Sequence, residues 1–180
     1  GFLIGTNLGS AYFPIPAHTS YLATNDDACD CDKGWDMFMS SSFDIPVNGI
    51  TKLKFSAVFK SLNNSSINDY AKVYISEIPN VWSSVFDIPD GDTTWTDYEI
   101  DFSTFLNGSF VGKNDLKLAF GYADGGDWAY GLALDDILLA NYDTAYSSKD
   151  YYVSLQSSRG CFYSSDTVSL IIGDQPSTSS

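Results

Sequence analysis

Regular alternation of apolar and polar residues is the feature that most limits how this chain can fold. It is clearest in residues 50–60, where one face carries Leu53, Phe55, Ala57 and Phe59 and the other carries Lys52, Lys54, Ser56 and Lys60. Successive side chains of a β-strand point to opposite faces, so this segment is predicted to be a strand with one buried face. The same pattern in residues 71–75 and 116–122 predicts further half-buried, antiparallel strands.

Turn-forming residues separate the predicted strands. Less regular apolar segments at 38–45, 81–88, 95–102 and 129–140 are also expected to form strands, and Asn, Asp, Gly and Ser cluster between them. No segment shows a convincing helical period, although residues 103–106 could form a single turn. Many short strands joined by turns predict an all-β fold, an antiparallel sandwich of two sheets.

The character of the chain changes after Asn141. Residues 147–149 resemble a linker, and residues 151–155 and 167–172 form two more strand-like segments before a polar tail. We therefore predict a first domain at 1–142 and a second segment at 143–180. This C-terminal β segment either begins a second β-module of a longer protein or adds strands to the first sandwich.

The charge of the chain excludes several classes of partner. There are 9 basic and 23 acidic residues, giving a formal net charge of −14, so nucleic acids and anionic lipid surfaces should be repelled. No apolar run is long enough to predict membrane insertion. Of the acids, 21 are Asp, a residue that favours turns and hard-cation sites over helix interiors.

A pair of acids inside a predicted strand points to a bound cation. Asp135 and Asp136 stand within the apolar segment 132–139, and consecutive strand residues face opposite sides, so one carboxylate should face the apolar side. Calcium bound by oxygens from another loop would remove that cost. Two alternatives stay open, namely an edge strand with both acids in solvent, or an Asp that caps backbone amides.

No catalytic constellation is recognisable, so the chain is predicted not to be an enzyme. His18 is the single histidine, and the chain has no Gly-x-Ser-x-Gly nucleophile elbow. Nearly all the Asp residues stand in polar turns, where a general acid with a raised pKa is not expected. Cys29 and Cys31 are too close in sequence to favour an unstrained disulfide, and a bridge from one of them to Cys161 stays open.

Several segments, in this order, carry a family resemblance. They are the sequence from Pro16 to Asp27, the segment Trp35-Asp36-Met37-Phe38-Met39-Ser40, the segment from Trp95 to Ser103, and the sequence Gly131-Leu132-Ala133-Leu134-Asp135-Asp136-Ile137. Together they resemble the cleaved-adhesin and MAM-like jelly-roll domains of secreted Bacteroidetes proteins, over roughly residues 1–142. The resemblance implies a jelly-roll sandwich with structural calcium, and it places the metal ligands at Asn25, Asp26, Asp27, Asp135 and Asp136.

The resemblance also implies a function. It predicts a non-catalytic extracellular adhesion module, secreted or at the cell surface, with covalently linked neighbour domains in a larger bacterial protein and a protein or glycan as ligand. A carbohydrate-binding module that serves a secreted hydrolase or protease is the alternative, and a spacer without a ligand is a third interpretation. The loop Asp124–Asp127 should lie at a sandwich end, where binding loops are common, so Trp128, Tyr130, Asp124 and Asp127 are the predicted ligand-binding residues.

Overall fold

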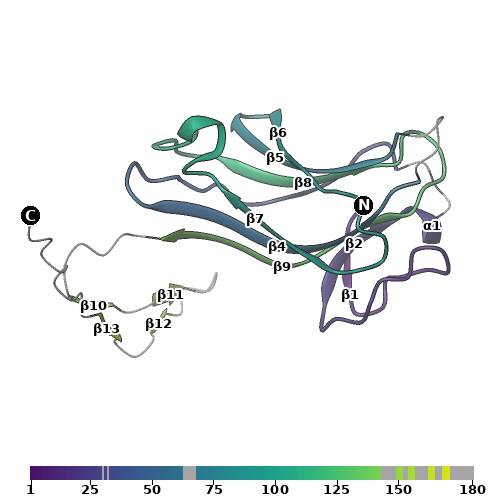
Figure 1. Cartoon of the computed structure of the whole chain (residues 1–180), viewed down its shortest axis with the longest axis horizontal. Coiled ribbons are helices and arrows are strands. Elements are labelled where there is room, and N and C mark those ends of the chain that lie inside the picture. Colours follow the sequence, from purple (N-terminus) through teal and green to yellow (C-terminus); the bar gives the residue numbers. More distant parts are fainter. Residues whose placement is uncertain are drawn as a thin grey trace, which may run out of the picture. The chain divides into compact units, whose positions relative to one another are not determined.

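The fold is an all-β sandwich of two antiparallel sheets with jelly-roll character, as predicted (Figure 1). The computed structural model describes residues 1–29, 31, 33–62 and 68–142, and the backbone of four short strands after residue 148. The chain divides into two units, Gly1–Tyr142 and Asp143–Ser180. In the second unit β10 (Lys149–Tyr151) pairs with β13 (Val168–Leu170), and β11 (Ser154–Gln156) pairs with β12 (Phe162–Ser164).

Two sheets form the first unit. The five-stranded sheet has the order β1 (Leu3–Gly5), β2 (Tyr21–Asn25), β9 (Gly131–Tyr142), β4 (Ile50–Lys60) and β7 (Thr96–Asp101). The four-stranded sheet has the order β3 (Asp36–Met39), β8 (Lys117–Ala123), β5 (Tyr70–Ile78) and β6 (Val81–Asp87). Both sheets mix strands from distant parts of the sequence, which is what a jelly-roll requires.

The main core fills the space between the two sheets. It contains the apolar residues that the alternation assigned to the inner faces, among them Leu53, Phe55, Val73 and Phe120, together with Leu134 of β9. Burying such side chains stabilises the fold by roughly 1.5–3 kcal/mol each.

A second apolar cluster lies on the other side of the five-stranded sheet. It consists of Phe13, Tyr21, Ala23, Val58 and Ala133, with Leu8, Ile15, Trp95 and Tyr130 packed against it. The alternation treats this face of residues 50–60 as polar, yet Val58 is fully buried. The reason is tertiary, because residues contributed by the N-terminal segment cover this half of the sheet.

Local structure departs from the predictions at β3, at α1 and in the strands β1 and β2, for which no strand was predicted. The predicted strand at 38–45 is shorter and earlier, as β3, and Phe43 forms only an isolated bridge with Leu116. A short helix, α1 (Asp26–Cys29), follows β2. The single turn expected at residues 103–106 is a 3-10 turn at Phe105–Gly108. No helix among the described residues is long and apolar enough to cross a membrane.

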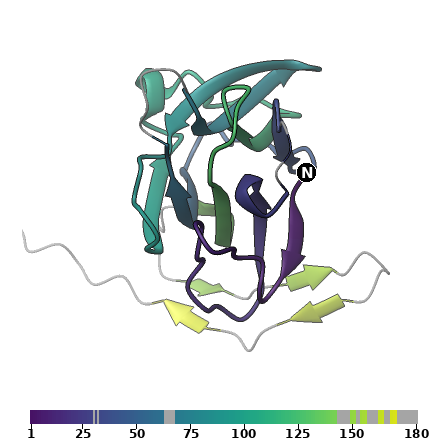
Figure 2. The same cartoon turned by 90° about the vertical axis from the view of Figure 1, so that its right-hand side faces the viewer.

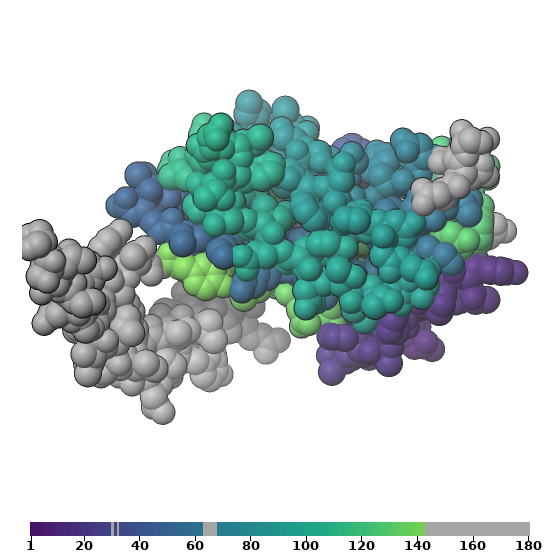
Figure 3. Space-filling view, in the orientation of Figure 1, coloured from purple at the N-terminus to yellow at the C-terminus, as the bar shows by residue number. Residues whose placement is uncertain are grey.

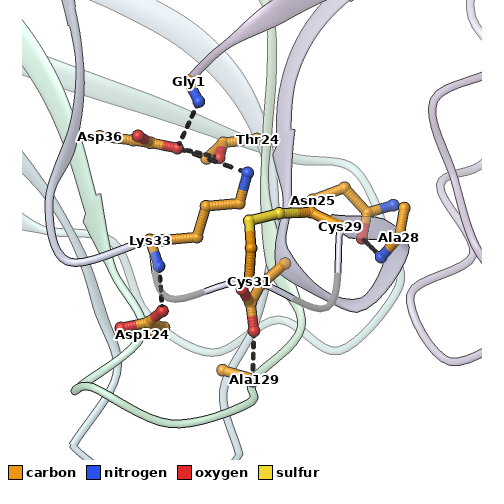
Figure 4. Close-up of a disulfide and its surroundings, with 11 residues drawn as sticks. Gly1, Thr24, Asn25, Ala28, Cys29, Cys31, Lys33, Asp36, Asp124 and Ala129 are labelled. Atoms are coloured by element: carbon orange, nitrogen blue, oxygen red, sulfur yellow. Dashed lines mark hydrogen bonds and ion pairs between the residues drawn. A yellow bond between two sulfur atoms is a disulfide. The ribbon is translucent and has the colours of Figure 1, made fainter.

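The cysteines differ from expectation. Cys29, the last residue of α1, forms a disulfide with Cys31, and their Cα atoms lie 5.2 Å apart, within the usual range for a disulfide (Figure 4). The structure therefore pairs the two cysteines despite their closeness in sequence. Cys161, the other candidate partner, lies outside the described residues.

Candidate functional site

The two adjacent acids of β9 occupy a β-bulge, not a regular strand. In the β4–β9 register Ser56 pairs with Asp135 and Lys54 with Leu138, so Asp136 and Ile137 together face Phe55 alone. Asp136 has a φ of 50°, and its backbone N–H donates to the Asp135 carboxylate at 2.8 Å. The premise that one of the pair must face the core was wrong, because the extra residue interrupts the alternation and leaves Asp136 exposed.

Asp135 instead faces the outer side of the five-stranded sheet. Its carboxylate contacts Nδ1 of His18, and Asp136 lies 4.0 Å from Nε2 of the same ring. The His18 ring packs against Trp95, with ring centroids 5.3 Å apart. His18 therefore contacts both acids of the bulge.

Asn25, Asp26 and Asp27 organise loops at one end of the sandwich. The Asn25 side chain accepts from the Ala28 N–H at 3.0 Å and donates to the Leu8 carbonyl at 2.8 Å. Asp26 is fully buried, and its Oδ2 accepts from the Ala129 N–H at 2.6 Å. The Asp27 carboxylate accepts from the Tyr12 N–H at 3.2 Å. Asp26 and Asp27 thus cap backbone amides of two distant segments, at Ala129 and Tyr12.

The structure does not bring the five predicted metal ligands together. Asn25 lies opposite Gly131 in the β2–β9 register, and Asp135 lies four residues farther along β9, a separation of about 13 Å at 3.3 Å per residue. Ligands of one calcium ion lie about 2.3–2.6 Å from it, so the two groups cannot share an ion in this arrangement. In the described part of the chain, no three His, Cys, Asp or Glu side chains are grouped to hold a metal. Calcium binding by either group stays a prediction.

The predicted ligand-binding loop does lie at the end of the sandwich, beside α1 (Figure 2). Asp124 is fully buried and accepts from the backbone N–H groups of Gly126, at 2.8 Å, and of Lys33 (Figure 4). Asp127 is exposed and accepts from the Trp128 N–H. Trp128 and Tyr130 are half-buried, and their ring centroids lie 5.2 Å apart. Asp124 thus serves the loop, whereas the two aromatic side chains reach the surface.

A larger candidate site lies along β5 and β6 of the other sheet. A groove of about 750 Å³ follows these strands and continues to the loop end of the sandwich. Its strand part is lined by Tyr70, Lys72, Tyr74, Trp82, Ser84 and Asp87, and its loop part by Ser61, Asn68, Asp69 and Asp90. Tyr70, Lys72 and Tyr74 alternate with the core residues Ala71, Val73 and Ile75, so they face away from the core.

Strand β8 leaves room for large rings beside this groove. The register sets Ala123, Gly121 and Ala119 opposite Tyr70, Lys72 and Tyr74, so small residues face long ones. A Cβ atom at Gly121 would lie 2.8 Å from both Trp35 Nε1 and Tyr74 Cε2. The Trp35 and Tyr74 rings therefore lie directly over this glycine, with centroids 5.7 Å apart, and Trp35 is 49% exposed.

Charged and hydroxyl groups stand beside these rings. Lys72 Nζ lies 3.0 Å from the Asp87 carboxylate and 5.3 Å from the centroid of the Tyr70 ring. Burial raises the pKa of Tyr74 to about 12, and the nearby Tyr70 and Asp87 act in the same direction. Like an ordinary tyrosine, Tyr74 keeps its proton at neutral pH and can act as a hydrogen-bond donor, and the raised pKa extends this to more alkaline pH.

None of the predicted ligand-binding residues lies in this groove, although the strands that carry its lining were predicted at residues 71–75 and 81–88. The signal was the spacing of Tyr70, Lys72 and Tyr74, three long side chains on one face of one strand. Trp35 comes from a distant segment, and only the tertiary structure brings it against Tyr74.

No protein-family model matches the chain, and no curated protein matches it in sequence. Solved structures similar to it include a family 11 carbohydrate-binding module from Clostridium thermocellum in complex with a β-1,3-1,4-mixed-linked tetrasaccharide. The two sequences are 16% identical, the TM-score is 0.45, and the match covers 81% of this chain and 84% of that one. TmCBM61 in complex with β-1,4-galactotriose has 11% identity, a TM-score of 0.45 and coverage of 78% and 81%. The enzymatically active domain of bacteriophage CBA120 tailspike protein 4 has 11% identity and a TM-score of 0.48, and the match covers 78% of this chain but only 18% of that one. At these TM-scores the likenesses say nothing of the ligand.

Proposed function

We propose that this protein is a non-catalytic carbohydrate-binding module, with a glycan held in the groove along β5 and β6. The observation that carries the proposal is the lining of that groove, where the aromatic side chains Tyr70, Tyr74 and Trp82 stand beside the Lys72–Asp87 ion pair. A sugar ring offers both an apolar C–H face and a rim of hydroxyl groups. Aromatic rings pack against the face, and charged side chains form strong hydrogen bonds with the rim.

The expected ligand is neutral. The net charge of −14 opposes the approach of polyanions such as sulfated or uronate-rich glycans. Lys72, the cation of the groove, is already paired with Asp87. A neutral glycan would exchange hydrogen bonds with this pair and leave the charge balance of the site unchanged.

Adhesion to a protein surface stays a prediction, and the groove favours it less. The buried centre of a protein interface is usually depleted of charged residues, whereas this groove has an ion pair between its aromatic side chains. Calcium, secretion, the cleaved-adhesin resemblance and neighbour domains in a larger protein also stay predictions.

Two carboxylates of the groove have structural partners, which supports a binding role without catalysis. Asp69 accepts from the Ser61 hydroxyl at 2.7 Å and from the Leu62 N–H at 3.0 Å. Asp87 is held by Lys72 and lies 3.4 Å from the Ser84 hydroxyl. Glycoside hydrolysis needs a pair of carboxyl groups free to act on the glycosidic bond. We expect no release of reducing sugar from any glycan that the protein binds.

A binding screen tests the proposal. The protein is applied to an array of neutral and anionic glycans, and positive glycans are titrated by calorimetry with the wild type, Trp35→Ala and Trp82→Ala. Loss of one aromatic platform should weaken binding at least tenfold, about 1.4 kcal/mol. Tyr142→Ala removes an exposed aromatic side chain from the other sheet and should bind like the wild type.

Two results would overturn the proposal. If no neutral glycan binds, or if Trp35→Ala and Trp82→Ala bind as tightly as the wild type, the groove is not a carbohydrate site. Capture of a purified extracellular protein with unchanged affinity in both variants would favour adhesion through another surface.

A further inference from the structure

We infer that Tyr12, Trp128 and Tyr130 form a second stacking site for a neutral sugar, separate from the groove. These residues are called here the end cluster. The ligand class rests on the proposed function, but the site rests on its own contacts. The inference makes the protein a module with two glycan sites at different surfaces.

The three rings form a connected aromatic surface. Tyr12 and Trp128 are nearly perpendicular, at 86°, with centroids 6.0 Å apart, and Trp128 meets Tyr130 at 67° and 5.2 Å. Tyr12 is 64% exposed. The Nζ of Lys60 lies 4.0 Å from the centroid of the Tyr130 ring, so a full positive charge already packs against one face of this ring. The C–H groups of a sugar carry a much weaker positive polarity, which attracts them to aromatic ring faces in the same sense.

Hydrogen bonds hold the backbone of all three aromatic residues, through the half-buried Asp27 and the exposed Asp127 carboxylates at Tyr12 and Trp128 and through backbone N–H groups at Tyr130. Asp27 accepts from the Tyr12 N–H, and Asp127 accepts from the Trp128 N–H at 2.8 Å. Tyr130 is held through its carbonyl, which accepts from the N–H groups of Asp26 and Asp27 at 2.9 and 3.3 Å.

Two further hydrogen bonds hold the backbone of the loop that carries Trp128 and Tyr130. The buried Asp26 carboxylate binds the Ala129 N–H, between Trp128 and Tyr130, and the buried Asp124 carboxylate closes the turn at Gly126. Burying a carboxylate destabilises the fold unless the carboxylate is well hydrogen-bonded, so a surface loop held by two buried carboxylates is unusual. Such a network holds the rings in a fixed geometry, and this preorganisation reduces the entropy lost when a ligand binds.

The end cluster and the groove lie on different sides of the sandwich. Tyr130 packs against the second apolar cluster, outside the five-stranded sheet, and Lys60 follows the core residue Phe59 and so points to that outer side. The groove instead follows β5 and β6 of the four-stranded sheet, and no residue of the end cluster lines it. The N-terminal segment, purple, lies at the right-hand end of this unit in the space-filling view (Figure 3), the end at which Figure 1 labels α1.

Two sites change how the protein should bind polymers. An oligosaccharide can occupy each site independently, whereas a polysaccharide can be held at both sites or can link two protein molecules. Joining two weak sites in one molecule can raise the overall affinity about 100-fold or more when both can be engaged. We therefore expect Trp128→Ala to weaken binding to a polymer far more than its effect on one oligosaccharide site would suggest.

Calorimetry with defined probes tests the inference. Cellohexaose, mannohexaose and β-1,4-galactohexaose are titrated into the full chain, into Trp128→Ala, into Tyr12→Ala and into the groove variant Trp82→Ala. For at least one hexasaccharide, the wild type should bind two molecules. Trp128→Ala and Trp82→Ala should each bind one, and Tyr12→Ala should weaken only the site that Trp128→Ala removes. Tyr12→Ala changes an exposed side chain, so it guards against misfolding of the loop.

The outcomes separate the two proposals. One bound molecule that is lost in Trp82→Ala and kept in Trp128→Ala overturns the second site and leaves the groove in place. One bound molecule that is lost in Trp128→Ala and kept in Trp82→Ala supports the end cluster and overturns the groove. Absence of binding of all three hexasaccharides to the wild type overturns the inference.

Discussion

Replacing Gly121 with alanine should damage the aromatic platform without removing any aromatic side chain. The new Cβ would lie 2.8 Å from Trp35 Nε1, and 2.8 and 3.3 Å from two carbons of the Tyr74 ring. Comfortable contacts between such atoms are about 3.5–4.0 Å, so both rings must move by roughly 1 Å. Trp35 is half exposed and can tilt outward, but Tyr74 is only 8% exposed and is confined by its neighbours.

The expected magnitude follows from that confinement. Inserting a methyl group into a packed site typically costs about 1–3 kcal/mol. For a unit of this size the midpoint of thermal unfolding should fall by roughly 3–10 °C. Moving the Trp35 ring off its position should also weaken glycan binding by about tenfold, or about 1.4 kcal/mol.

Thermal unfolding followed by tryptophan fluorescence, together with calorimetric titration of the best hexasaccharide, measures both effects. Gly91→Ala is the matched control, because its Cβ would meet nothing closer than 3.5 Å. It should leave the midpoint unchanged or slightly raised. If Gly121→Ala melts and binds like Gly91→Ala, the rings do not lie over Gly121 and the platform described here is wrong.

Three further predictions concern the metal, the pH dependence and the disulfide. Calcium bound by the Asp26–Asp27 loop or by the Asp135–Asp136 bulge should raise the unfolding midpoint by several degrees at millimolar calcium, and a chelator should reverse the rise. An unchanged midpoint would contradict the predicted metal sites and would fit the backbone amides that Asp26 and Asp27 already bind. The pKa of Tyr74 is raised to about 12, so the folded state holds a proton that the unfolded state loses above its ordinary pKa near 10. The contribution of Tyr74 to the free energy of unfolding is therefore complete below pH 10 and is lost as the pH rises toward 12. In urea titrations, the free energy of unfolding should fall less between pH 9 and pH 11 in Tyr74→Phe than in the wild type. An equal fall in both proteins would contradict this. Reducing the Cys29–Cys31 disulfide should lower the free energy of unfolding by only roughly 1.5 kcal/mol, because the loop that it closes is very short. Equilibrium unfolding with and without reductant measures this change in the free energy of unfolding, with the double variant Cys29→Ser/Cys31→Ser as the reference. A much larger loss of stability would mean that the disulfide stabilises more than the loop that it closes.

The strands were largely predictable because their physics is local. The alternation in residues 50–60 matches β4, since a strand with one face on the core needs that pattern whatever lies opposite. The same alternation located β5 and β8, and the turn-forming Asp and Gly residues located the loop that precedes Trp128.

Predictions failed where a residue's role depends on its partner. At Asp135 and Asp136 the alternation was extended across a β-bulge, and a bulge is a property of the pairing with β4, not of β9 by itself. The family resemblance places metal ligands in the early loop, and that role stays a prediction. The hydrogen bonds of Asp27 to the Tyr12 amide and of Asp26 to the Ala129 amide join distant segments, so no local pattern could show them.

By itself, then, the sequence determined the strand-forming segments, the inner faces of the strands, the turns and the strongly acidic surface. Each of these depends on a residue and its near neighbours along the chain. The tertiary structure alone decided which strands are adjacent, which outer faces are covered, and which aromatic side chains meet. Trp35 reaches Tyr74, and Tyr12 reaches Trp128, because sheet pairing closes long stretches of chain into contact. A surface able to hold a sugar requires rings from several such stretches, and no local pattern encodes their distance.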